Sequence, residues 1–278
     1  YIQKENAKKS NFCKKIALDN AESLTREEQT EKIKELFYET KELMGCWILM
    51  FQLSGAVEEY LRKEAAEQGI TIEEIFAAVN SPRETLLMQY EQAWRKLAQK
   101  IHPKKNRKRM NTELLHLLKE FGWVGTHSYR GKGLTKKQVL WQIKSAKERT
   151  QEKKQMKHFP QKIEEAIAIA SEIAYYRMTS AELYDKMNYE CRPLLNNVAK
   201  QLKVSYNQLI FMTFPEIIEA LRKTKKTSKI EINERIKAYG IITKGDDVEV
   251  FKGERLKDEL KKYAQAIDVK QPIKGIAA

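Results

Sequence analysis

The sequence predicts a mostly α-helical fold, a helical bundle of long and short helices with a small C-terminal β-hairpin. Glycine and proline are scarce, with 11 and 6 residues among 278, which disfavours an all-β architecture built on many tight turns. Apolar residues recur every three or four positions over long stretches, as they do on one face of a helix. β-branched residues flank a Gly-Asp turn at 241–251, and this pattern predicts the hairpin.

A capping box predicts the first long helix. Thr25 and Glu28 stand three residues apart, so the hydroxyl and the carboxylate can each satisfy a free amide of the first turn. Gly69 is expected to end this helix, because glycine readily adopts the left-handed conformation of a helix C-terminus. One apolar stripe is expected to face the core, and its residues are Ile33, Leu36, Phe37, Leu43, Met44, Trp47, Met50 and Phe51.

Similar signals predict the helices that follow. A short helix is expected after Thr71, and another after Ser81, with Pro82 at the first helical position, where a missing amide costs nothing. Asn111 is expected to cap a helix that ends at Phe121. A long helix is expected to start at Pro160 and to bend at 178–180. The tail 273–278 is expected to be extended. The remaining helices are expected to start at Thr135, Ser205, Thr213 and Ile232 and after Gly253.

Composition sets the broad class of the protein. Hydrophobic residues make up 42% of the chain and charged residues 32%, which is enough apolar material for a core and argues against global disorder. Three cysteines lie far apart without a Cys-x-x-Cys pair, as is typical of free thiols in a reducing compartment. The most apolar run, 43–57, is shorter than the roughly 20 residues that span a bilayer. We therefore expect a cytoplasmic protein without a membrane partner.

The net charge of +14 leaves two interpretations open. Lysines are scattered along the whole chain, which favours a solvated surface or a surface that meets an acidic partner domain. A basic run from Lys104 to Arg109 could instead bind nucleic acid, but it lacks the interleaved aromatic residues of a single-strand site. Nucleic acid therefore remains the alternative partner.

Known catalytic motifs do not account for the chain. Arg130-Gly131-Lys132-Gly133 lacks the Gly-Lys-Ser/Thr ending of a P-loop. His-Glu-x-x-His, a cysteine–histidine cluster and Gly-x-Ser-x-Gly do not occur either, so zinc and serine-hydrolase chemistry have no support. We predict no catalytic and no metal-binding residues in this segment.

An ordered series of short motifs carries a family resemblance. Glu120-Phe121-Gly122-Trp123-Val124 precedes Tyr129 and Gly133-Leu134-Thr135, and a long helix then bears Tyr176-Arg177. Val204 to Leu209, Met212 to Ile217, the hairpin and Pro272 to Ala278 follow in this order. Over roughly 110–278 this series resembles the helical region that precedes the mobile phosphohistidine domain in PEP-utilising enzymes. That family includes phosphoenolpyruvate synthase, pyruvate phosphate dikinase and the rifampicin phosphotransferases.

The resemblance implies a division of labour. An ATP-grasp domain, in the same chain or acting in trans, phosphorylates a histidine of the mobile domain with ATP and Mg²⁺, and the mobile domain delivers the phosphoryl group to an acceptor. That domain would follow Ala278. The chain then divides into an N-terminal helical region (1–109), a core linker or acceptor region (110–229) and a small α+β segment (230–278). The phosphocarrier histidine of the family follows Thr-Ser after glycines, which His127 does not match.

Five residues are the candidates for holding a small-molecule acceptor. Trp123, His127, Tyr129 and Arg130 lie in a loop between two predicted helices, and aromatic, imidazole and guanidinium groups suit an aromatic or anionic ligand. Arg177 joins them because it matches a family position. The competing interpretation is that Trp123 fills the core while its neighbours are solvated.

These observations predict a helical acceptor-binding or linker domain of a phosphotransferase, a transferase or kinase segment that is not catalytic by itself. Such a segment would bind no cofactor and would position a small-molecule acceptor for transfer from the phosphohistidine domain. Two alternatives stay open, a basic nucleic-acid-binding module and a pure scaffold between domains.

Overall fold

The computed structural model confirms the mostly α-helical fold. Among the residues that it describes it contains eleven helices and one two-stranded antiparallel hairpin. The chain forms two compact units, 1–197 and 198–278, which are treated separately below; the three-part division predicted from the sequence stays a prediction. The described residues are 12, 23–100, 107–127, 129–145, 158–223, 228–244 and 247–266.

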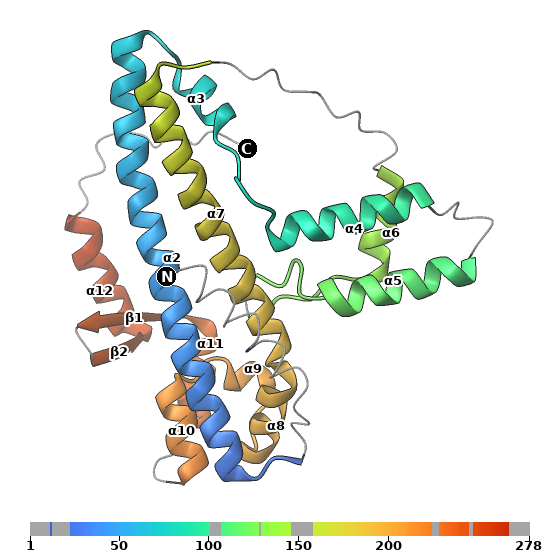
Figure 1. The fold of residues 1–278 in the computed structure, drawn as a ribbon. Helices are drawn as coiled ribbons and strands as arrows, with labels where there is room; N and C mark the ends of the chain where they lie inside the picture. Colours follow the sequence, from blue (N-terminus) through green and yellow to red (C-terminus); the bar gives the residue numbers. More distant parts are fainter. Residues whose placement is uncertain are drawn as a thin grey trace. The chain divides into compact units, whose positions relative to one another are not determined.

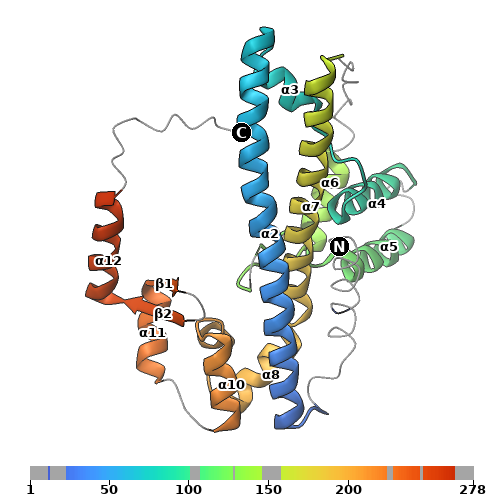
Figure 2. The same cartoon turned by 60° about the vertical axis from the view of Figure 1, so that its left-hand side comes forward.

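Two long antiparallel helices form the axis of the first unit. α2 (Arg26–Gln68) and α7 (Gln161–Glu190) lie side by side, as Figures 1 and 2 show from two directions. Near one end of the pair, Leu61 and Ala65 of α2 pack against Ile163 and Ala166 of α7. Small alanines on this stripe allow helices to approach closely.

The predicted limits of α2 are confirmed. The backbone amide of Thr25 donates to Glu28 Oε2 at 2.7 Å, and the amide of Glu28 donates to Thr25 Oγ1 at 3.2 Å, which completes the capping box. At the other end, Gly69 has a φ of 64°. These signals act within one turn, so the sequence alone specifies them.

The predicted core stripe of α2 is partly wrong. Met50 is buried, but Phe51 is 56% exposed and Phe37 is 37% exposed. Successive residues are 100° apart around a helix, and Phe51 lies too far around the helix from Met50 and Leu43 to reach α7. The stripe that faces α7 is therefore narrower than the apolar pattern.

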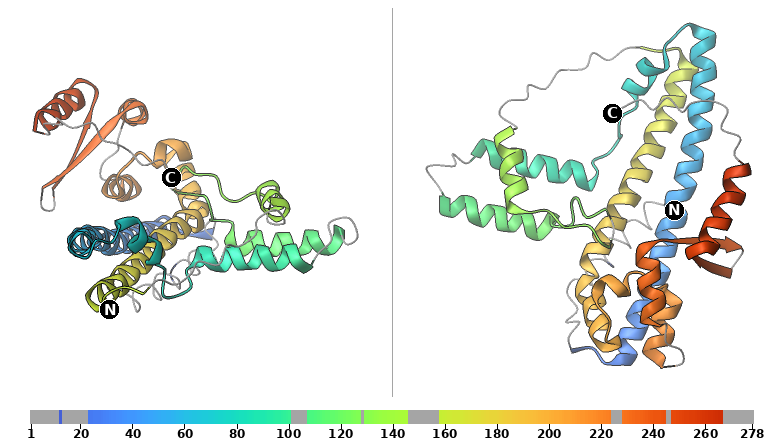
Figure 3. Two further views of the ribbon diagram at one scale, coloured as in Figure 1. Left: turned by 90° about the horizontal axis from the view of Figure 1, so that it is seen from above. Right: turned by 180° about the vertical axis from the view of Figure 1, so that it is seen from behind.

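Four shorter helices, α3 to α6, lie between α2 and α7 in the sequence. Thr71 caps α3 with both bonds of a capping box, and Thr135 caps α6 through Gln138, as predicted. Figure 3 shows α4, α5 and α6 grouped together beside α7. The bounds are Ile72–Ala78 for α3, Leu86–Lys100 for α4, Arg107–Phe121 for α5 and Lys136–Ser145 for α6.

Two predicted helix starts of the first unit are wrong. α4 begins at Leu86 rather than at Pro82, because Thr85 Oγ1 accepts the amide of Met88 at 3.3 Å and so caps the helix later in the chain. α5 begins before Asn111, which lies on the helix surface and accepts a hydrogen bond from Lys136 Nζ. Asn111 therefore holds two helices together instead of capping one.

α7 continues as a helix through residues 178–180, where a bend was predicted. α7 runs unbroken to Glu190, and the break follows at Cys191, before α8 (Arg192–Leu202). Pro193 explains its position, because its nitrogen has no proton to donate to the carbonyl four residues earlier.

The second unit combines short helices with the hairpin. α9 starts after Ser205 and α10 after Thr213, as the sequence predicted, and each start has a capping box. In the hairpin Ile241 pairs with Val250, which confirms the predicted strands, while the turn residues 245–246 and the predicted extended tail 273–278 lie outside the described residues. The elements are α9 (Tyr206–Leu209), α10 (Phe214–Arg222), α11 (Lys229–Lys237), β1 (Tyr239–Lys244), β2 (Asp247–Lys252) and α12 (Gly253–Ala266).

A buried ion pair ties the second unit together. Arg235 of α11 is 4% exposed and donates to both carboxylate oxygens of Glu216 in α10, at 2.7 and 2.8 Å. The same guanidinium also bonds Glu231 at 2.7 Å. Two planar groups joined by parallel hydrogen bonds fix the relative orientation of their helices.

Candidate functional site

An open groove of about 480 Å³ lies among α4, α6 and α7 of the first unit. Its volume is within the range of pockets that hold small molecules. Val124, in the loop after α5, also lines it. The apolar lining residues are Leu87, Met88, Tyr90, Trp94, Val124, Trp141 and Met178.

The groove is rich in aromatic and thioether surface. Trp94 is nearly buried, whereas Trp141 is 65% exposed, and Met88 and Met178 are also exposed. An exposed tryptophan offers a large rigid surface to a ligand, and methionine side chains adapt to irregular apolar shapes. This lining suits an apolar or aromatic molecule.

Polar groups line one part of the groove. Tyr90 donates its hydroxyl proton to Gln142 Oε1, and burial raises the pKa of Tyr90 to about 12, against the smaller opposite effect of this hydrogen bond. Arg95 pairs with Glu91 at 2.8 Å and lies over the Trp94 ring, 5.4 Å from its centroid. These fixed donors and acceptors could orient a ligand that also carries polar groups.

One face of α7 contacts the groove, α4 and the loop after α5. Met178, Glu182, Asp185 and Tyr189 are spaced by four, three and four residues, so their side chains line the same face of the helix. Met178 lines the groove, and the other three bind α4 or the loop after α5. At 1.5 Å per residue, Met178 and Asp185 lie about 10 Å apart along the helix.

Glu182 holds the start of α4. Its Oε2 accepts the backbone amide of Leu86 at 2.8 Å, and the residue is 3% exposed. Burial raises the pKa of Glu182, and the hydrogen bonds from Thr85 and Leu86 offset only part of this effect. A carboxylate at a helix N-terminus satisfies free amides, so Glu182 fixes the helix that forms much of the groove.

The segment before α4 is held by the tyrosines of α7. The Arg83 guanidinium lies over the rings of Tyr175 and Tyr176, 4.3 and 5.1 Å from their centroids, and also bonds Glu172. Cation–π contacts of this kind favour arginine over lysine. Tyr176, one of the residues that carries the family resemblance, thus helps to position α4.

The glycines of the loop after α5 are explained by packing. The amide of Leu134 donates to the carbonyl oxygen of Gly122 at 2.8 Å, and a Cβ atom on Gly133 would overlap both that oxygen and the Tyr189 ring. A Cβ atom on Gly131 would likewise overlap the backbone of Thr126. The basic glycine segment 130–133 therefore folds back tightly on the loop.

The loop presents His127 beside a half-buried carboxylate. His127 Nδ1 lies 3.4 Å from Asp185 Oδ2, and the histidine side chain is 83% exposed. Burial raises the pKa of Asp185, while His127 acts in the opposite direction. His127 has a φ of 49°, a conformation uncommon outside glycine. A histidine bonded through one nitrogen can exchange a proton through the other.

The structure brings three of the five predicted residues to one loop near the C-terminal part of α7. Tyr129 packs edge-on against Tyr184, with centroids 6.5 Å apart, next to the His127–Asp185 pair, and Arg130 is exposed nearby in the chain. Arg177 does not join them, since its Nη1 donates to Ser54 Oγ of α2 at 3.2 Å. A binding role for these residues stays a prediction.

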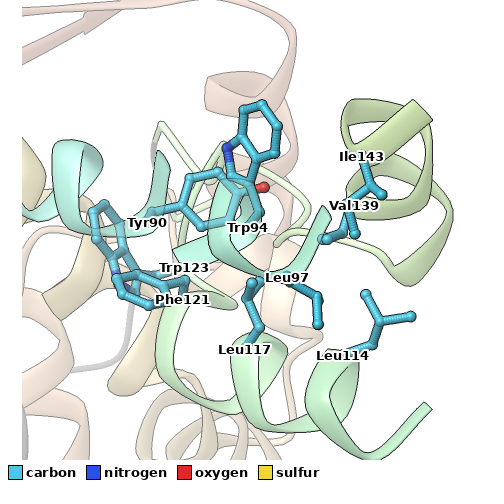
Figure 4. Packing of buried hydrophobic residues seen from close by; sticks show 9 residues of the cluster. All are labelled: Tyr90, Trp94, Leu97, Leu114, Leu117, Phe121, Trp123, Val139 and Ile143. Carbon is cyan, nitrogen blue, oxygen red and sulfur yellow. The ribbon is translucent and has the colours of Figure 1, made fainter. Parts of the chain in front are cut away.

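Trp123 packs into the unit's second core. It is 2% exposed and belongs to a cluster from α4, α5 and α6, where Figure 4 shows it with Phe121 and Tyr90. The rings of Tyr90 and Phe121 lie 5.5 Å apart. Trp123 thus supports the groove from within, while its neighbour Val124 lines it.

Sequence reasoning missed the groove residues themselves. Trp141 offered a signal, because a tryptophan among the lysines and glutamines of α6 lies off the stripe of Val139 and Ile143. Met88 offered another, since α4 has more apolar residues than one buried stripe needs. Met178 offered none, because its role depends on the distant helix α4.

Three further predictions from the sequence concern metal binding, membrane spanning and the basic run from Lys104 to Arg109. The described residues contain no group of three or more His, Cys, Asp or Glu side chains that could hold a metal ion. Within the same residues, no helix is both long and apolar enough for a membrane span. Lys104 and Lys105 of the basic run lie outside the described residues, and Arg109 is exposed on α5.

Comparisons of the chain with protein-family models, with curated proteins and with solved structures gave no match.

Proposed function

We propose that this chain is the helical acceptor-binding segment of a phosphotransferase related to phosphoenolpyruvate synthase, and that the groove among α4, α6 and α7 holds the acceptor. The observation that carries the proposal is the groove itself, with exposed Trp141, Met88 and Met178 around fixed polar groups. A small molecule with an aromatic or apolar body and a hydroxyl group fits this chemistry.

Positioning is the contribution that the segment would make. Holding an acceptor in one orientation removes much of the entropic barrier to its reaction. Glu182, Arg83 and the packed glycine loop all fix the groove to α7.

Two other parts complete the proposed reaction. An ATP-grasp domain using ATP and Mg²⁺ would load a histidine of a mobile domain, and that domain would approach the acceptor. The mobile domain is expected beyond Ala278 in the reading frame, with a glycine-flanked Thr-Ser-His. A reading frame that continues past Ala278 without that motif would contradict the phosphotransfer part of the proposal.

The partial reactions provide the experiment. The full product of the gene is incubated with ATP, Mg²⁺ and a panel of hydroxylated aromatic compounds, and phosphohistidine and phosphorylated acceptor are measured separately. We expect Trp141→Ala to lower acceptor phosphorylation about tenfold or more while phosphohistidine forms normally. Ile169→Ala, an exposed residue of α7 outside the groove, is the control. Equal acceptor phosphorylation in both variants would favour a pure scaffold.

A further inference from the structure

The middle of α2 carries an exposed apolar patch. Ile48, Leu49, Phe51 and Leu53 are 51%, 53%, 56% and 41% exposed. The buried face of the same helix, with Met50 and Leu43, already contacts α7. Around the helix Ile48 lies between Phe51 and Leu49, and exposed apolar side chains that adjoin one another are typical of an interaction surface.

Two glycines on α2 have no explanation in the packing of the described residues. A Cβ atom built on Gly45 or Gly55 would meet no heavy atom within 4 Å. Glycine inside a helix destabilises it by about 1 kcal/mol relative to alanine. Glycine does allow another backbone to come unusually close, so both positions are suited to a second helix that lies directly on α2.

The exposed face has the spacing of a helix–helix seam. Six exposed residues follow one another at alternating intervals of four and three and therefore share the side of α2 opposite Met50, with Ile48 as the apolar side chain among them. The seam residues are Lys41, Gly45, Ile48, Gln52, Gly55 and Glu59.

The seam is also self-complementary about its centre. Gly45 and Gly55 are equally far from Met50 along the helix, and so are Lys41 and Glu59, which are both exposed. In an antiparallel pair with its two-fold axis at Met50, each Gly45 would face a Gly55 and each Lys41 would face a Glu59. A two-fold interface requires this reciprocity, in which one surface matches itself.

We propose that two copies of this chain associate through α2 in this antiparallel arrangement. The glycines bring the helix backbones together, the apolar patches cover each other, and two Lys41–Glu59 pairs set the register. The charge pattern fits a second copy, because an antiparallel helix of the same sequence brings each Lys41 opposite a Glu59. This surface lies outside the groove residues, so the inference does not depend on the proposed function.

Sedimentation of the 278-residue chain tests the proposal. We expect a dimer that Ile48→Glu weakens about tenfold or more, because a charge would be buried without a partner. Ile169→Glu, at an equally exposed isoleucine of α7, should leave the dimer intact. A chain that stays monomeric at about 100 μM, a concentration at which weak specific pairs associate, would overturn the proposal.

Charge exchange distinguishes a second copy from any other partner. Lys41→Glu and Glu59→Lys should each weaken the dimer severalfold by placing like charges together. The double variant should restore the wild-type dissociation constant, because the exchanged charges meet again across the axis. Circular dichroism verifies that each variant is folded. A dimer in which the double variant is as weak as the single variants would not be the one proposed.

Discussion

The carboxylate of Glu182 accepts the backbone amide of Leu86 at 2.8 Å, although 96 residues separate them in the chain. This bond joins the start of α4 to the middle of α7. Because α4 supplies much of the groove lining, the shape of the groove depends on one buried side chain of another helix.

Removal of this carboxylate should loosen α4. We expect Glu182→Ala to lower the free energy of unfolding by about 2 kcal/mol, the effect of losing a buried helix cap. Glu182→Gln should be milder, because burial already disfavours the charged form. Urea unfolding measures both, with exposed Glu165→Ala on α7 as the control. Equal stability of the Ala variant and the control would show that the cap is unimportant.

The His127–Asp185 pair predicts a pH effect. Burial raises the pKa of Asp185 and His127 opposes it, so His127→Ala should raise that pKa further. A carboxyl group with a raised pKa stabilises the fold below its unfolded pKa, and this contribution is lost as pH rises through the folded pKa. His127→Ala should therefore lose more stability than the wild type as pH rises from below the unfolded pKa of Asp185 through its folded pKa. An NMR titration of Asp185 in which the variant pKa is unchanged or lower would contradict this.

The glycine loop predicts a steric effect. Gly133→Ala would place a methyl group against the Gly122 carbonyl and the Tyr189 ring, and overpacking of this kind destabilises by about 2 kcal/mol. Thermal unfolding compares it with Lys132→Ala, an exposed neighbour that should have little effect. A Gly133→Ala protein as stable as this control would mean that the loop can move away from α7.

The Arg235–Glu216 pair predicts the behaviour of the second unit. Arg235→Met leaves a partly buried carboxylate without its main partner and should lower stability by about 3 kcal/mol. The exposed pair of Arg255 and Glu249 is the control, and Arg255→Met should change stability by less than about 1 kcal/mol. Denaturant unfolding followed by circular dichroism measures both. Similar losses in the two variants would contradict a special role for Arg235.

The Arg235–Glu216 pair predicts a pH dependence of stability that is opposite in sign to that of the His127–Asp185 pair. Burial alone would raise the pKa of Glu216, but the hydrogen bonds from Arg235 and Thr213 outweigh it and hold the pKa below its ordinary value. A lowered pKa stabilises the fold above the unfolded pKa, and this contribution disappears as pH falls through the folded pKa. Arg235→Met should therefore show a weaker loss of stability in acid than the wild type.

The sequence predicted the features that depend on neighbouring residues. The helix starts at Thr25, Thr71, Ser205 and Thr213, the end of α2 at Gly69 and the strands of the hairpin all follow from local hydrogen bonding and turn chemistry. The positions of Phe51, Asn111 and Trp123 depend on which distant helix packs against each one. Pattern reasoning placed Phe51 in the core and Asn111 at a cap, and the structure shows otherwise.

The candidate site was harder to predict for the same reason. His127 and Tyr129 could be singled out as unusual loop residues, but Asp185 and Tyr184, which they contact, lie more than 50 residues away. The groove is formed by several residues of α4 and α6 and by Met178 of α7, and these residues look ordinary in their own helices. Only the packing of these helices brings Trp141, Met88 and Met178 together.

Ligand binding by this chain alone tests the central claim, that the groove takes up an apolar or aromatic small molecule. Anilinonaphthalene sulfonate, which fluoresces in apolar sites, serves as the probe in a titration of the wild type and of the Trp141→Ala, Met88→Ala and Ile169→Ala variants. The account predicts that the two groove variants weaken binding about tenfold and that Ile169→Ala does not. Equal affinity in all four proteins, or no binding to the folded wild type, would contradict it.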